Sequence, residues 1–250
     1  MLVSIITPYY SNKEFIIKTV NSVLLQTYKN WELIIVDDEN SEESKLILNN
    51  IKISNPNKIN IFSTKINSGA AFSRNLGIKK SKGKLIAFLD SDDYWKKNKL
   101  EKQILELRKK KGDFVYTNYS IVNINNNRQR NIRCDEIINY DALLKNCPIC
   151  CSSVLLKKKI LNKIKFKNYK TKEDYDLWLR ILKNNYKFVH VKSFLTFYTK
   201  RKKSLSSNHF NNIANAYKIY ESNFGFKPFK IVYFIMILYM NAFKKNIINI

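Results

Sequence analysis

The sequence predicts an α/β fold with an open, mostly parallel central sheet. In residues 1–120, short apolar runs alternate with segments of helical periodicity, which is the pattern of repeated strand–helix units. The length of 250 residues suits one large domain, or one domain with a small appendage, and is enough to bury a substantial core. The aromatic and aliphatic content excludes a disordered chain.

The first elements follow from the apolar pattern. Residues 3–6 predict a buried strand that ends at Thr7-Pro8, and residues 12–26 predict a helix with Ile16 and Val20 on its inner face. Residues 33–36 predict a second strand, which runs directly into Asp37-Asp38. The same alternation predicts helices at 42–52, 70–80 and 99–110 and strands at 59–63, 85–89 and 114–116.

The second half of the chain is less regular. Residues 118–133 are polar and predict a hairpin or a mobile loop, and order returns at 152–156. An amphipathic helix is expected over 172–184, with Leu177 and Trp178 facing inward. The remaining predicted elements are strands at 188–191 and 194–198, a basic loop at 200–203 and a helix at 211–222.

The charge balance limits the classes of partner. There are 45 Lys and Arg against 20 Asp and Glu, a net charge of +25, which attracts phosphates, anionic lipids or nucleic acid. The codon bias of an AT-rich genome is an alternative origin for part of this excess. A basic nucleic-acid-binding module is the rival function from another class. Such a module concentrates its basic and aromatic residues on one element, whereas here they are spread along the chain, so no nucleic-acid partner is expected.

The N-terminus and the cysteines indicate a reducing compartment. MLVSIITPYY lacks the basic segment, the long apolar segment and the cleavage site of a secretory signal, so a cytoplasmic location is expected. Four cysteines make no disulfide scaffold. Cys147 and Cys150 form a C-x-x-C with Pro148 between them and no second pair at zinc spacing, so we expect buried free thiols rather than a metal site.

The C-terminal segment 229–243 contains an unbroken run of ten apolar residues, 231–240. A helix that spans a bilayer needs about 20 such residues, so this run is too short to cross a membrane. Lysine pairs on either side, Lys227 with Lys230 and Lys244 with Lys245, suit a helix lying in a membrane interface. A helix packed on the domain or on a second subunit is the alternative.

Three acidic groups stand where chemistry is expected. Asp90 and Asp92 follow the strand at 85–89 and suit a hard divalent cation with its diphosphate, although an acidic turn that caps a helix is the alternative. Asp38 could accept hydrogen bonds from a base or a ribose, or cap the next helix. Asp174 suits a general base, and with Thr171 it also makes a capping box.

The order of these pieces resembles an inverting family 2 glycosyltransferase with the GT-A fold, of the bacterial surface-polysaccharide type. The resemblance covers about residues 2–205. It implies a Rossmann-like sheet with a nucleotide-sugar-binding half at 1–118, an acceptor-binding and catalytic-base half at 119–205, and a helical extension at 206–250. The matching segments are VSIITPYYSNKEFIIKTVNSVLLQTYKNWELIIVDD (3–38), NSGAAFSRNLGIKKSKGKLIAFLDSDDYW (67–95) and EDYDLWLRI (173–181).

The resemblance also implies roles for single residues. Asp38 contacts the base, usually uracil, and Asp174 is the catalytic base. Asp92 is the main protein ligand of Mn²⁺ or Mg²⁺, with Asp90 beside the ribose and the metal. Arg74 either contacts phosphate or braces the loop. The nucleotide-binding residues expected in this way are Thr7, Pro8, Tyr10, Asp38, Arg74 and Asp90.

Two departures from the family pattern bear on the site. Glu39 stands where the family has Gly after the Asp pair. Thr199 and Arg201 stand where the family often has Arg and His. Because arginine cannot ligate a metal, we expect Arg201 to pair with the diphosphate instead.

The resemblance implies a hexosyltransferase that moves a sugar from a nucleotide-diphosphate donor, in most cases a UDP-sugar, to a hydroxyl of a growing surface glycan or lipid-linked oligosaccharide. Its expected place is the cytoplasm, peripheral at the inner face of the cell membrane, and a homodimer is a further expectation. A non-catalytic homologue that acts as a subunit is the remaining alternative. The intact Asp38, Asp92 and Asp174 speak against that alternative.

Overall fold

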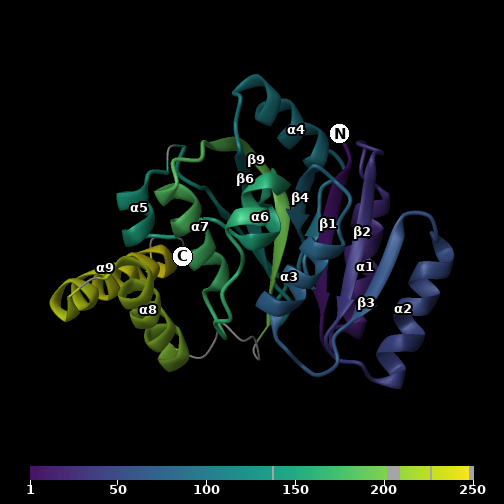
Figure 1. Ribbon diagram of the computed structural model, residues 1–250, viewed down its shortest axis with the longest axis horizontal. Coiled ribbons are helices and arrows are strands. Elements are labelled where there is room, and N and C mark those ends of the chain that lie inside the picture. Colours follow the sequence, from purple (N-terminus) through teal and green to yellow (C-terminus); the bar gives the residue numbers. More distant parts are fainter. Residues whose placement is uncertain (137, 202–208, 226, 248–250) are drawn as a thin grey trace.

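The computed structural model describes residues 1–136, 138–201, 209–225 and 227–247, with only the backbone described at 209–210, 223–224 and 242–247. One nine-stranded sheet runs through the molecule (Figure 1). Its strands follow the order β3-β2-β1-β4-β8-β6-β9-β5, and β7 pairs with β6 outside this path.

Helices and strands alternate along the first half of the chain as the sequence predicts. The strands are β1 (Val3–Tyr9), β2 (Trp31–Asp37), β3 (Ile59–Ser63), β4 (Leu85–Phe88), β5 (Tyr94–Trp95), β6 (Phe114–Asn123), β7 (Arg128–Ile132), β8 (Leu155–Lys157) and β9 (Phe188–Lys200). The helices are α1 (Lys13–Leu24), α2 (Glu42–Ser54), α3 (Ala70–Lys80), α4 (Lys99–Lys109), α5 (Tyr140–Lys145), η1 (Cys151–Ser153), α6 (Lys158–Lys163), α7 (Glu173–Lys183), α8 (His209–Phe224) and α9 (Pro228–Ile247).

The order in which the strands are added to the sheet reverses at β1. β1 lies between β2 and β4 and is parallel to both, and β2 is parallel to β3. The chain therefore leaves β1 toward one edge of the sheet through β2 and β3, and later returns to the other side of β1 with β4. In open α/β sheets ligands bind at such a switch point, outside the carboxyl ends of the strands. The fold thus brings the segments after β1, β2 and β4 to one end of the sheet.

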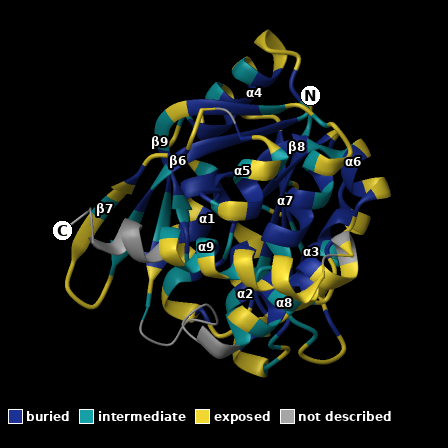
Figure 2. Ribbon diagram, turned by 90° about the vertical axis from the view of Figure 1, so that its left-hand side faces the viewer, coloured by how far each residue is buried: buried dark blue, intermediate teal, exposed yellow. Residues whose placement is uncertain are grey.

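Both faces of the sheet are covered by helices, which explains why β1, β2 and β4 are mainly apolar and buried. Successive strand residues enter opposite layers, so that Ile5 packs with α1, α2 and α4 while Ile6 packs with α3, α6 and α7. Trp178 of α7 is completely buried in the second layer. Most of the sheet is buried in Figure 2, and exposed residues gather on the outer helix faces and along β7 and its turn to β6.

Two predicted boundaries are wrong, those of β1 and of the strands at 188–198, and the open alternative for 118–133 is decided. β1 continues through Pro8 because residues beyond Ile6 pair only with β2, where a missing N–H is tolerated. The polar stretch 118–133 is a β6–β7 hairpin, with a turn of four residues between its strands. The two strands expected at 188–198 are one strand, β9, whose register with β6 shifts beside Asn118.

The C-terminal helix α9 has two different faces. Ile231, Phe234 and Leu238 are buried in the same layer as Trp178, so the helix packs on the domain (Figure 1). Its other face carries exposed apolar side chains at Phe229, Val232, Tyr233, Met236 and Met240. Across the residues the structure describes, no helix combines the length and the apolar character needed to cross a membrane.

Substitutions on these two faces should differ sharply in their effect on stability. We expect Ile231→Ala to lower the free energy of unfolding by about 2–5 kcal/mol, because it removes a completely buried side chain and leaves a cavity. Val232→Ala, on the adjacent exposed position, should change it by about 0.5 kcal/mol or less. Guanidinium unfolding of both variants measures this, and equal losses would contradict the packing of α9 on the core.

Candidate functional site

The carboxyl end of β1 and the residue that follows it contribute side chains at three different depths. Thr7 is completely buried, Pro8 is half-buried and Tyr10 is 53% exposed. Thr7 Oγ1 has no hydrogen-bond partner among the residues the structure describes. These residues therefore lie at the expected end of the sheet, and their contact with a nucleotide stays a prediction.

Asp38, which follows β2, is anchored by the β3–α3 loop. Its carboxylate accepts hydrogen bonds from Thr64 Oγ1 (2.7 Å) and from the backbone N–H groups of Ser68 (2.9 Å) and Gly69 (2.8 Å). Gly69 has φ +85° and ψ 166°, a conformation that is essentially restricted to glycine. This network fixes the loop against the end of β2, and it leaves acceptor capacity on the carboxylate for a base.

Helix capping, the alternative role for Asp38, is performed by other residues. Asp37 accepts from the N–H groups of Glu39 and Asn40 and from Ser44 Oγ, which orders the turn into α2. Ser41 is the N-cap residue, and its hydroxyl accepts from the Ser44 N–H at 3.0 Å. Asp38 is therefore free of the capping role.

Arg74 of α3 connects the acidic segment after β4 with the start of α7. It is only 4% exposed, and its guanidinium forms ion pairs with Asp90 after β4 (2.6 Å) and with Glu173 at the start of α7 (2.6 Å). The sequence alone left open whether this arginine contacts phosphate or braces the loop. Both terminal nitrogens donate to carboxylates of the protein, which supports the bracing role, and contact with phosphate stays a prediction.

Asp92 forms an ion pair with Arg201. Arg201 Nη2 lies 2.7 Å from Asp92 Oδ2, and its guanidinium lies 5.5 Å from the centre of the Phe15 ring. Burial raises the pKa of Asp92 above its usual value, and the nearby charge of Asp90 adds to this while Arg201 opposes it. Two carboxylates thus lie close together, and one arginine offsets their repulsion.

Asp93 anchors the acidic loop, residues 90–93 after β4, from its buried side. It is completely buried, accepts from Ser152 Oγ (2.6 Å) and from the Thr199 N–H (2.9 Å), and its pKa lies well above the usual value because of burial and the charges of Asp92 and Asp90. Thr199 Oγ1 also donates to the Asp92 carbonyl, at 2.5 Å. Sequence reasoning missed Ser152, because no local pattern connects η1 with the loop after β4.

The acidic loop fits a hard divalent cation. Asp90 Oδ1 and Asp92 Oδ2 are bound to arginines, which leaves one oxygen of each carboxylate for other ligands. No group of three or more His, Cys, Asp or Glu side chains that could hold a metal is found over the described parts of the chain. Mg²⁺ and Mn²⁺ are commonly held by one or two carboxylates together with substrate phosphates, so this donor set suits them when a diphosphate is bound.

Asp174 lies in the first turn of α7 and is half-buried. Its Oδ1 accepts from the N–H of Tyr175 at 2.7 Å. Burial raises the pKa of Asp174 to about 6, and the charge of Glu173 adds to this while Arg74 opposes it. A carboxylate with a pKa close to neutral pH is suited to general base catalysis.

The capping box expected at Asp174 is wrong, because the N-cap position is Lys172 with φ +64° and its side chain makes no capping hydrogen bond. Thr171 instead accepts a hydrogen bond from Asn215 of α8 at 3.0 Å. The nearby carboxylate of Asp176 is completely buried and bound by Arg180 at 2.5–2.9 Å, so it does not replace Asp174 as a base.

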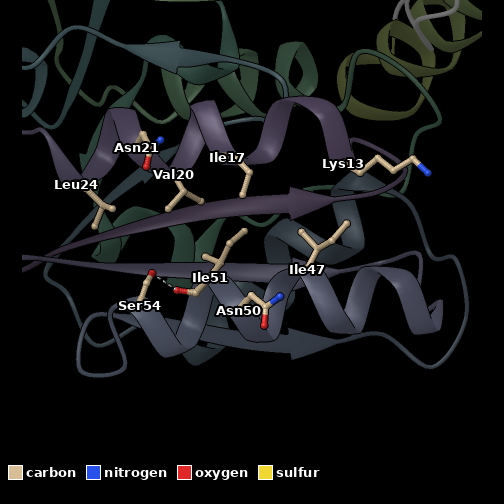
Figure 3. Close-up of a pocket in the computed structure, with 9 residues that line it drawn as sticks. All are labelled: Lys13, Ile17, Val20, Asn21, Leu24, Ile47, Asn50, Ile51 and Ser54. Atoms are coloured by element: carbon tan, nitrogen blue, oxygen red, sulfur yellow. Dashed lines mark hydrogen bonds between the residues drawn. The ribbon is translucent and has the colours of Figure 1, made fainter.

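Of the four cysteines, which were expected to be buried, Cys134 and Cys151 are buried, whereas Cys147 and Cys150 are half-buried. Burial raises the pKa of Cys150 and Cys151 well above the usual value, which makes them unreactive. An apolar groove of about 340 Å³ lies between α1 and α2 (Figure 3). Lys13, Ile17 and Ile51 are among its lining residues, and no predicted site residue lines it.

Known proteins resemble this chain in sequence and in fold. Residues 4–165 match the family described as Glycosyl transferase family 2. The chain belongs to this family. It is 37% identical to the UDP-Glc:alpha-D-GlcNAc-diphosphoundecaprenol beta-1,3-glucosyltransferase WfgD of Escherichia coli, over 98% of this chain and 95% of that protein. It is 34% identical to the putative teichuronic acid biosynthesis glycosyltransferase TuaG of Bacillus subtilis, over 88% of this chain and 87% of that protein.

Solved structures show the same GT-A architecture for this family 2 glycosyltransferase. Residues 1–349 of S. aureus TarS in complex with UDP-GlcNAc superpose with a TM-score of 0.73 at 19% identity, over 94% of this chain and 70% of that one. The mannosyltransferase PcManGT of Pyrobaculum calidifontis, in complex with GDP-Man and Mn²⁺, superposes with a TM-score of 0.70 at 13% identity, over 90% and 64%. The predicted fold class and family are therefore confirmed.

The elevated pKa of Asp174 predicts a pH dependence. The carboxylate acts as a base only when deprotonated, so turnover should fall about tenfold per pH unit below about pH 6. Asp174→Asn should fold and bind donor, lose about a hundredfold to ten-thousandfold in turnover, and lose this acid limb. Steady-state rates between pH 4.5 and 8.5 measure both effects. A near-normal rate in Asp174→Asn would place the base elsewhere.

Proposed function

We propose that this family 2 glycosyltransferase moves a hexose from a UDP-sugar to a sugar hydroxyl of a lipid-linked acceptor, with inversion at the anomeric carbon. The observation that carries the proposal is the Arg74 bridge. It joins Asp90, on the expected donor side, to Glu173, the neighbour of the expected base Asp174. A donor held at the acidic loop would thus lie beside a carboxylate able to activate an acceptor.

The donor is assigned to residues 1–118 and the acceptor to residues 119–205. Asp38 is proposed to bind the base, uracil by preference, with Thr7, Pro8 and Tyr10 near the nucleotide. The match to WfgD over nearly the whole of both chains supports a UDP-sugar as donor and a sugar on a lipid diphosphate as acceptor. The TarS complex with UDP-GlcNAc supports the place of the donor in the fold.

The chemistry is proposed as a single displacement. Asp174 takes the proton of the acceptor hydroxyl as that oxygen attacks the anomeric carbon, and the bond to the nucleoside diphosphate breaks on the opposite side. One in-line attack inverts the configuration. Arg74 holds Asp90 and Glu173 in place, which fixes the approach of the two substrates.

Charge on the leaving diphosphate is neutralised by groups at the acidic loop. Mn²⁺ or Mg²⁺ held by Asp92 and Asp90 would act as a Lewis acid on the diphosphate. Arg201 pairs with Asp92 here, and a diphosphate bound at the loop offers it two further anionic partners. Arg201 is therefore proposed to turn from Asp92 to the diphosphate when the donor binds. The expected basic neighbours Lys202 and Lys203 lie outside the described residues.

A donor-binding assay tests this function. We expect UDP-glucose and UDP to stabilise the protein thermally with Mn²⁺ or Mg²⁺, and chelator to abolish most of this effect. Asp92→Asn should remove the metal-dependent part, because an amide is a neutral and weaker ligand for a hard cation. Glu106→Gln, on the distant α4, is the matched control and should behave as the unmodified protein. Unchanged UDP-sugar affinity of Asp92→Asn in Mn²⁺ would remove Asp92 from the site.

A membrane surface is the proposed site of action, peripheral at the inner face of the cell membrane. The exposed face of α9 carries Phe229, Val232, Tyr233, Met236 and Met240, and Lys227 and Lys230 lie exposed beside it. Apolar side chains next to lysines suit an interface of anionic lipids. The side chains of Lys244 and Lys245 are outside the described residues. A lipid-linked acceptor would be presented at the same surface.

Vesicle binding tests this assignment. The full chain should co-sediment with vesicles of anionic phospholipid and be partly released by salt, because screening weakens the lysine contribution and leaves the apolar one. Val232→Ser with Met236→Ser should reduce binding strongly. The control is Leu46→Ser, an equally exposed apolar position on α2, which should not. A dimer-to-monomer change in the α9 variant without any vesicle effect would make this face a subunit contact instead.

A further inference from the structure

Two hydrogen-bond donors near the start of α7 have no acceptor among the described residues. Lys172 Nζ forms no ion pair or hydrogen bond with the residues that the structure describes, and this side chain is half-buried. Tyr239 Oη is buried and likewise has no hydrogen-bond partner among those residues. A buried donor without a partner costs free energy, so the hydroxyl of Tyr239 requires an explanation.

The two donors come together from different elements. Lys172 is the N-cap residue of α7, and Tyr239 lies on α9. Lys172 Nζ lies 5.9 Å from the centre of the Tyr239 ring and 5.9 Å from the centre of the Tyr175 ring. This is the outer limit of a cation–π contact, so the rings flank the ammonium group without neutralising it.

The surroundings of Lys172 favour an anionic ligand. Burial lowers the pKa of Lys172, and the opposing contributions come only from Cys147 and Asp174. An anion placed between Lys172 and Tyr239 would accept from both donors and would favour the charged form of the lysine. The left-handed backbone of Lys172, φ +64°, is a strained conformation of the kind that is kept at functional sites.

The position of Lys172 next to the proposed base Asp174 connects the bound anion with the acceptor. Lys172 and Asp174 lie in the same turn at the start of α7, so a ligand could reach both. In a sugar diphosphate the attacking hydroxyl and the anomeric phosphate belong to one ring. We propose that Lys172 and Tyr239 bind the diphosphate of a lipid-linked acceptor while Asp174 receives the proton of its sugar hydroxyl. This inference rests on the proposed function.

The lipid end of such an acceptor also has a suitable surface. Tyr239 is flanked on α9 by Leu238, which faces the core, and by Met240, which belongs to the exposed apolar face. A diphosphate bound at Tyr239 would therefore place its lipid chain beside the side of α9 that we assign to the membrane. Membrane contact and acceptor recognition would then depend on one helix.

Binding of two synthetic acceptors tests the proposal. One is GlcNAc α-diphosphate with a short alkyl chain, and the other is the same sugar joined to the alkyl chain without phosphate. Affinities are measured by calorimetry on the UDP-saturated protein, so the readout does not depend on transfer. We expect the unmodified protein to prefer the diphosphate, and Lys172→Met and Tyr239→Phe each to weaken it about tenfold or more.

The controls separate this site from the rest of the enzyme. Lys172→Arg should keep the preference, and Lys170→Met, an exposed lysine two residues away, should not change it. UDP affinity and melting temperature should be unchanged in all variants. Equal affinity of the unmodified protein for both acceptors would overturn the proposal, and so would an unaltered preference in Lys172→Met. Failure of the proposed function would give a different result. The unmodified protein would then not bind UDP-sugars, or it would bind the diphosphate acceptor without glycosylating it.

Discussion

The arrangement of the site depends on the buried guanidinium of Arg74. It holds a carboxylate from the carboxyl end of β4 and a carboxylate from the start of α7, residues that are distant in the sequence. A buried ion pair that loses one partner leaves an uncompensated charge, which commonly costs about 3–5 kcal/mol. The bridge therefore fixes the position of the acidic loop relative to the helix that carries Asp174. We infer that donor and acceptor are brought together because the guanidinium of Arg74 pairs with both Asp90 and Glu173.

The acidic residues differ in role because their surroundings differ. Asp93 is buried beneath the loop and bonded to Ser152 and Thr199, so it shapes the loop. Asp92 is more accessible and is paired with Arg201. We propose that it exchanges this arginine for the metal ion of the donor complex. Asp174 has a raised pKa of about 6 and is available as a base. The net charge of +25 favours the approach of anionic diphosphates to the molecule.

Sequence patterns predict what is local and periodic. The strand ends at Asp38 and Asp90 were predictable because apolar runs end there, and their order along the chain matches the family. Contacts between distant segments were not predictable: Arg74 and Glu173 are 99 residues apart, and nothing near Lys172 points to Tyr239. The Thr171–Asp174 capping box was mispredicted because Asn215 of α8 takes the threonine hydroxyl. Tertiary partners decided each of these cases.

The coupling between Arg74 and Glu173 in the transfer rate tests the account most directly. Arg74→Gln, Glu173→Gln and the double variant would be compared in turnover at pH 8, where Asp174 is deprotonated in all of them, with UDP affinity measured in parallel. If the bridge positions α7, Glu173→Gln should slow transfer while UDP binding is kept, and the double variant should be no slower than Arg74→Gln alone. Losses that multiply, or a normal rate in Glu173→Gln, would contradict the account.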